Sequence, residues 1–172
     1  ASALAPSSFA TRQTVAVKEI QQYMHNEETA VPHESSLGTR FILARNSLVL
    51  IKLRPIFGWG TGSFAAAYQK FAPEAQVKKV KRVNPHNQYL LTWIELGLPG
   101  LISLLSIFIV MAKIFYDARQ LNGYLGLGLV ITFAMGCSMN SWLLDFTSAF
   151  FFVFFAAVFA AGVKKQVSAF CQ

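Results

Sequence analysis

A single histidine, His86, lies where a basic polar segment meets a long apolar one, within the stretch from Asn84 to Gly100. A histidine ring ordinarily titrates at a pKa of about 6.5, so near neutral pH it can accept a proton from a hydroxyl group. Such a residue can also be an interfacial polar cap on a membrane helix, which is the more ordinary interpretation of the residues alone. Asn87, the next residue, could orient the ring or a bound hydroxyl compound.

Three arginines upstream could bind a phosphate: Arg40, Arg45 and Arg54. An arginine suits a phosphate or diphosphate group because its guanidinium is always charged and offers a fork of donors. On one helix Arg40 and Arg54 would be about 21 Å apart, so they cannot grip the same diphosphate. We therefore expect one to meet the substrate and the other to meet lipid headgroups or another segment of the chain.

A second group of cations includes Lys81 and Arg82, in a run of four cations within residues 78–82. Charge alone would allow nucleic-acid binding, but aromatic residues are not interleaved with these cations and membrane-like helices follow. A phosphate-bearing lipid is the more natural partner, and we expect no nucleic acid.

The upstream arginines must be positioned by a helix from Ser35 or Ser36 to about Arg54, because serine is a good N-cap and Pro55 disfavours continuation. The predicted apolar face of this amphipathic helix consists of Phe41, Ala44, Leu48 and Ile51. The alternating glycines of residues 57–64 let the backbone turn sharply or approach a ligand closely, but they form no dinucleotide-binding motif. A short helix is expected at about residues 62–71.

The second half of the chain has the composition of a membrane domain, and 54% of all residues are hydrophobic. Residues 120–144 and 146–163 carry no charge, and uncharged apolar runs of this length are typical of transmembrane helices. Flanking apolar residues extend a third run, which follows a break expected at the Gly-Leu-Pro-Gly segment of residues 97–100. We expect an all-α polytopic membrane protein with transmembrane helices at about residues 97–116, 124–142 and 146–163, rather than a soluble core.

The distribution of cations predicts the orientation in the membrane. The short loop 117–123 and the C-terminal tail carry cations, whereas the turn at residues 140–145 carries none. Short loops rich in Lys and Arg stay in the cytoplasm. We therefore expect residues 1–96 to be a periplasmic loop region with amphipathic helices, and residues 97–172 to contain three membrane helices and a short cytoplasmic tail. Since the chain begins with Ala and lacks a signal-peptide pattern, we expect the C-terminal part of a longer protein.

Four segments in this order resemble the O-antigen ligase and O-antigen polymerase superfamily, which includes bacterial O-oligosaccharyltransferases. They are SSLGTR (35–40), RPIFGWGTGSF (54–64), NPHNQYL (84–90) and ELGLPG (95–100). The resemblance covers about residues 35–116. Proteins of this superfamily have many more membrane helices, so the chain is similar to their large periplasmic loop followed by the last three helices.

The resemblance implies a metal-independent glycosyltransferase that needs no cofactor. The donor would be a glycan on undecaprenyl diphosphate, and transfer would occur at the periplasmic face of the bacterial inner membrane. The acceptor hydroxyl belongs to lipid A-core in the ligases of lipopolysaccharide biosynthesis, to a growing glycan in the polymerases, and to a protein in the O-oligosaccharyltransferases.

The resemblance also assigns roles to residues. The histidine of the family corresponds to His86, which makes it the expected catalytic base, and the loop arginine corresponds to Arg40. The expected substrate-binding residues are Arg45, Arg54, Asn87, Lys81 and Arg82. A different class of function, a non-catalytic membrane scaffold or lipid-binding subunit, is the alternative.

Overall fold

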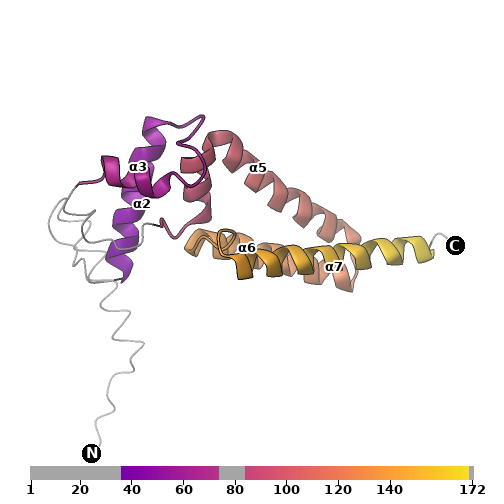
Figure 1. Cartoon of the computed structure of the whole chain (residues 1–172). Coiled ribbons are helices and arrows are strands. Elements are labelled where there is room, and N and C mark those ends of the chain that lie inside the picture. The colour runs from indigo at the N-terminus through magenta and orange to yellow at the C-terminus, as the bar shows by residue number, and fades with distance from the viewer. Residues whose placement is uncertain (1–35, 74–83, 171–172) are drawn as a thin grey trace, which may run out of the picture. The chain divides into compact units, whose positions relative to one another are not determined.

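The computed structural model describes residues 36–73 and 84–170, and the regular structure in these ranges is entirely helical (Figure 1). Five helices make up this part of the chain: α2 (Ser36–Leu53), α3 (Phe64–Phe71), α5 (Gln88–Ala118), α6 (Leu121–Met139) and α7 (Phe146–Phe170). The expectation of an all-α protein is confirmed.

Three of these helices are long and apolar enough to cross a membrane: Gln88–Ala118, Leu121–Met139 and Phe146–Val163. Only 11% of the apolar window of the first and of the third is buried inside the protein, against 28% for the second. Apolar side chains that face away from the protein along such helices are suited to lipid. The chain is therefore a membrane protein with three spans in its C-terminal part.

The chain divides into two compact units, Ala1–Leu43 and Ala44–Gln172, and the boundary falls within α2. The described part of the first unit is the beginning of α2, which carries Arg40. The second unit contains the rest of α2 together with α3 and the three spans. All contacts described below lie within this second unit.

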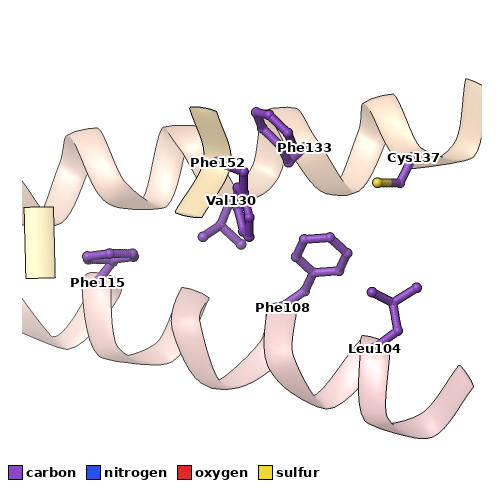
Figure 2. Packing of buried hydrophobic residues seen from close by; sticks show 7 residues of the cluster. All are labelled: Leu104, Phe108, Phe115, Val130, Phe133, Cys137 and Phe152. Atoms are coloured by element: carbon purple, nitrogen blue, oxygen red, sulfur yellow. The ribbon is translucent and has the colours of Figure 1, made fainter. Parts of the chain in front are cut away.

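Helix α6 packs against both α5 and α7, which explains its greater burial (Figure 1). Figure 2 shows the buried cluster that joins the three helices, formed by Leu104, Phe108, Phe115, Val130, Phe133, Cys137 and Phe152. The ring of Phe133 lies 4.7 Å from that of Phe152 and 5.1 Å from that of Trp142, measured between centroids. Aromatic packing therefore links α6 to α7 and to the connection between them.

Small residues let α5 and α6 approach closely. A Cβ atom added at Gly126 would lie 2.5 Å from the ring of Phe115, and one at Gly123 would lie 2.6 Å from the carbonyl oxygen of the same residue. Lipid gives membrane helices no hydrophobic drive to associate, so close packing at small residues contributes much of the attraction. Gly123 and Gly126 thus make room for Phe115.

Helix α5 is broken at Gly97, where φ is 70° and ψ is −164°. This conformation is accessible to glycine but strained for other residues. The expected break in the Gly-Leu-Pro-Gly segment is confirmed. We call this position the Gly97 break.

The glycine-rich segment after α2 braces the Gly97 break through backbone hydrogen bonds. The amides of Trp59 and Gly60 donate to the carbonyls of Ile94 and Glu95 at 2.8 and 2.9 Å. A Cβ atom at Gly58 would lie 2.6 Å from the backbone nitrogen of Gly97. The close approach that these glycines permit is therefore made to another part of the backbone.

The structure buries a different side of α2 from the predicted apolar face. Phe41 and Leu48 are 41% and 51% exposed, whereas Ser47 and Leu50 are buried. In the predicted face only Ile51 is buried. The reason is that apolar residues occur on all sides of α2, so their spacing does not determine which side packs against the rest of the protein.

Candidate functional site

The backbone at His86 has an unusual conformation, with a φ of 49°. Few residues other than glycine adopt a positive φ, although histidine does so more often than most. The amide of His86 donates a 2.9 Å hydrogen bond to Oδ1 of Asn84, which closes a side-chain turn around the buried Pro85. The local sequence thus holds His86 in a tight turn immediately before α5.

Asn87 begins α5 and also connects it to α6. Its Oδ1 accepts a 3.0 Å hydrogen bond from the amide of Leu90, the usual role of an asparagine N-cap. Its Nδ2 donates to the carbonyl of Ser138 at 3.0 Å. Both halves of the side-chain amide are therefore used, and the position of His86 is fixed relative to two helices.

The connection between α6 and α7 completes the surroundings of the histidine. Nδ1 of His86 lies 3.1 Å from Oδ1 of Asn140, and the hydroxyl of Ser141 donates to Oδ1 of Asn84 at 2.9 Å. We call Asn84, His86, Asn87, Asn140 and Ser141 the His86 cluster. Its five members come from two segments that are more than 50 residues apart in the sequence.

Two residues at the start of α5 extend this bracing. Oε1 of Gln88 accepts from the amide of Leu143 at 3.2 Å, and the hydroxyl of Tyr89 donates to the carbonyl of Ala134 at 2.7 Å. The first contact ties the start of α5 to the α6–α7 connection, and the second ties it to α6. The His86 cluster is consequently held in place from both sides before any ligand binds.

Three of the expected cationic residues lie on α2 or directly after it. Arg40, Arg45 and Arg54 are exposed, and Arg40 belongs to the first unit. The guanidinium of Arg54 lies 4.4 Å from the ring centroid of Trp59, next to the Gly97 break. Lys81 and Arg82 lie outside the described residues. Of the predicted site residues, the structure brings His86 and Asn87 into one hydrogen-bonded cluster.

An apolar hollow of about 390 Å³ lies beside Arg54 and is lined by Arg54, Pro55, Ile56, Phe57 and Gly58. Phe57 is 86% exposed and Ile56 is 56% exposed, so this edge presents apolar side chains next to a cation. A lipid presents the same two kinds of group, an apolar chain and a charged headgroup.

Among the described residues outside the spans, two groups have shifted pKa values. Hydrogen bonds from the amide and the hydroxyl of Ser148 lower the pKa of Asp145, the residue before α7. Burial raises the pKa of Tyr68, whose hydroxyl accepts a hydrogen bond from Asn46. Their hydrogen-bond partners, Ser148 and Asn46, are not members of the His86 cluster. In the described part of the chain, no three His, Cys, Asp or Glu side chains lie together as metal ligands would.

Asn140 and Ser141 were not predicted from the sequence. The one feature used at residues 140–145 was the lack of a cation, because an asparagine after an apolar helix is an ordinary cap residue. A usable signal was present: the polar pair follows the second span at the same membrane face on which His86 was expected. Two polar groups at one face of neighbouring spans can meet.

Comparison with known proteins identifies the family. A sequence model described as O-Antigen ligase matches residues 3–105, more than half of the 172 residues. An uncharacterized protein of Haemophilus influenzae (strain ATCC 51907 / DSM 11121 / KW20 / Rd) is 34% identical over 113 residues, which cover 64% of this chain. The chain spans 27% of the length of that relative. On the family match, this chain belongs to the O-antigen ligase family.

Proposed function

We propose that the protein transfers a glycan from undecaprenyl diphosphate to an acceptor hydroxyl at the periplasmic face of the bacterial inner membrane. Family membership supports a lipid-linked glycan as the class of substrate. The acceptor would be a glycolipid or a growing glycan, as in ligases and polymerases of lipopolysaccharide biosynthesis, and we propose that no metal ion or cofactor takes part. Membrane lipids would surround the spans.

The observation that carries this proposal is the strained backbone of His86, together with the hydrogen bonds that hold the residue in place. Residues held at positive φ tend to occur at functional sites, where the surrounding structure maintains them against a cost of about 1–3 kcal/mol. An interfacial cap would not need two connections to a second helical hairpin, through Asn140 and through Asn87. A base needs this fixed position, because proton transfer requires the ring to lie within hydrogen-bond reach of the acceptor.

The proposed reaction is a displacement at the sugar carbon that is joined to the diphosphate. The acceptor oxygen forms a bond to this carbon, the bond from the carbon to the diphosphate oxygen breaks, and His86 takes the proton of the hydroxyl. Undecaprenyl diphosphate leaves with the bonding electrons. Arg40 is proposed to stabilise its charge, because a guanidinium donates two parallel hydrogen bonds to a phosphate.

The remaining cations are proposed to hold the donor lipid. Arg54 lies beside the apolar hollow at residues 54–58, which suits the first part of the donor's lipid chain, and its guanidinium would meet a neighbouring lipid headgroup and not the diphosphate that Arg40 holds. Arg45, Lys81 and Arg82 would add positive charge near the diphosphate. Asn87 would keep His86 in position for the acceptor hydroxyl, because its two hydrogen bonds fix the start of α5.

The orientation is also part of the proposal. His86 and the α6–α7 connection lie at one end of the spans, since Asn140 and Ser141 bond to the His86 turn. The α5–α6 connection, which carries Arg119, follows the other end of α5. If short cationic loops stay in the cytoplasm, His86 faces the periplasm, where acceptors for exported glycans are found.

The test uses the full-length protein with His86→Gln and Arg40→Ala in a strain that lacks the native gene. Loss of surface glycan at normal protein level is the expected result for both. Normal surface glycan in both variants would favour a non-catalytic scaffold or lipid-binding subunit instead. If transfer is lost only from glycosylated proteins while lipopolysaccharide stays normal, the acceptor is a protein and the enzyme is an O-oligosaccharyltransferase.

A further inference from the structure

We propose that Asn140 is a positioning residue that holds His86 in the tautomer with its proton on Nδ1, so that Nε2 is the ring nitrogen that accepts the proton. The pairing follows from the contacts of the described residues. Its consequence for transfer rests on the proposed function of His86 as the base.

The orientation of the Asn140 side chain is fixed by a backbone amide. The amide of Ser141 lies 2.9 Å from Oδ1 of Asn140 and can only donate, so the atom that it meets must be the carbonyl oxygen of the side chain. The same oxygen lies 3.1 Å from Nδ1 of His86. An oxygen that only accepts requires a donor on the ring, and therefore the hydrogen of His86 is on Nδ1.

Neighbouring contacts keep this oxygen in position. Oδ1 of Asn84 accepts from the amide of His86 and from the hydroxyl of Ser141, each at 2.9 Å. Ser141 is only 4% exposed, so its hydroxyl is held within the protein. The turn that carries the histidine and the residue that follows Asn140 are thus joined through one acceptor, which fixes the distance from the ring to Asn140.

The tautomer decides which nitrogen can do the chemistry. With the proton on Nδ1, the lone pair of Nε2 is available to an acceptor hydroxyl. With the proton on Nε2, that nitrogen would donate a hydrogen bond and could not take a proton. Without Asn140 the ring would adopt both tautomers and rotate more freely, so a smaller share of the protein would be ready to react.

The first test measures the tautomer directly and needs no activity. Full-length protein labelled with ¹⁵N-histidine is reconstituted in lipid vesicles, and ¹⁵N NMR spectra are recorded at alkaline pH, where histidine rings are neutral. His86→Gln identifies the His86 signals by their disappearance. We expect a protonated Nδ1 in the wild type and in Asn140→Asp, whose carboxylate still accepts, and a mixture of tautomers in Asn140→Ala.

The second test measures transfer with the same variants as surface glycan at matched protein level. Asn140→Ala should lower transfer roughly tenfold or more, since removing the residue that orients a functional histidine commonly lowers activity by this amount. Asn140→Asp should restore most of it. Asn122→Ala, which changes an asparagine near the opposite end of α6, should match the wild type in both tests.

The outcomes separate this inference from the proposed function. A wild-type His86 protonated on Nε2 would overturn the inference whatever the activity. A tautomer that changes in Asn140→Ala while transfer stays normal would overturn the positioning role. If His86→Gln retains transfer, the proposed function of His86 fails, whereas the NMR result still supports or overturns the pairing with Asn140.

Discussion

The His86 cluster lies at the start of α5, and the Gly97 break lies within α5. At each place a segment distant in the sequence contacts irregular backbone, but different groups make the contacts. At the Gly97 break, backbone amides donate to backbone carbonyls and the glycines remove side chains from the contact. At the His86 cluster, side chains of Asn84, Asn87 and Asn140 make the bonds. The backbone contacts at the Gly97 break hold two segments together, whereas the side-chain contacts at the His86 cluster orient one imidazole ring.

This difference separates two motifs that look alike as sequence. GWGTG and NPHN are both short polar turns next to apolar helices, and both could approach a ligand. The first approaches the backbone at Gly97 closely through Gly58. In the second, the polar side chains form hydrogen bonds that hold His86 against α6 and the α6–α7 connection. The comparison predicts that changes in the first reduce the amount of folded protein, and changes in the second reduce transfer.

The largest expected effect is on activity and comes from His86→Gln. Removal of a general base typically lowers a rate by about 10²–10⁴-fold, which should eliminate surface glycan. Binding of undecaprenyl diphosphate to the full-length protein in vesicles should stay near normal, because the base contacts only the acceptor hydroxyl. His25→Ala and His33→Ala, which change histidines outside the described residues, are the controls and should transfer normally. Near-normal transfer by the glutamine variant would show that His86 is not the base, so the His86 cluster would have no chemical role.

The next effect is on stability and comes from Gly58→Ala. Its Cβ would lie 2.6 Å from backbone atoms of both Gly97 and Ile94, and its φ of 66° already disfavours a side chain. We expect a loss of roughly 2 kcal/mol or more, seen as lower protein level and a lower thermal midpoint in detergent.

The matched control is Gly62→Ala. Gly62 has a similar φ of 71°, but a Cβ there would have no atom within 4 Å. This variant should lose only the strain of about 1 kcal/mol. Equal losses at Gly58 and Gly62 would mean that conformation alone, and not the close contact at the Gly97 break, makes the glycine necessary.

A smaller effect distinguishes the arginines. Arg40→Lys keeps the charge but loses the two-pronged donor, so transfer should fall roughly tenfold if Arg40 holds the diphosphate. Arg54→Lys should be tolerated, because Arg54 is too far from Arg40 along the helix to share that diphosphate. Surface glycan at matched protein level is the measurement. Equal tolerance at both positions would make Arg40 a contact to lipid headgroups only.

Much of this architecture follows from local patterns in the sequence. The uncharged runs predict the spans, and the Gly-Leu-Pro-Gly segment predicts the break in α5, because the causes of both lie within a few neighbouring residues. The partner of His86 could not be predicted in this way. Asn140 is 54 residues away, and its contact depends on how α5 and α6 pack. The buried side of α2 was missed for a related reason, since apolar side chains suit both lipid and a protein core.

The smallest effects come from two single hydrogen bonds that are alike in chemistry and differ in region. Tyr89 donates to the carbonyl of Ala134 at 2.7 Å beside the His86 cluster, and Trp59 donates to the carbonyl of Leu50 at 3.0 Å beside the Gly97 break. Tyr89→Phe removes only its hydrogen bond and should cost about 1 kcal/mol in thermal stability. Trp59→Phe also replaces the indole beneath Arg54 with a smaller ring, so it should cost slightly more. Only Tyr89→Phe loosens the start of α5 against α6, so it alone should also lower transfer, by less than Asn140→Ala does. Equal transfer by the two phenylalanine variants would show that positioning of His86 depends on its own cluster and not on the bracing that surrounds it.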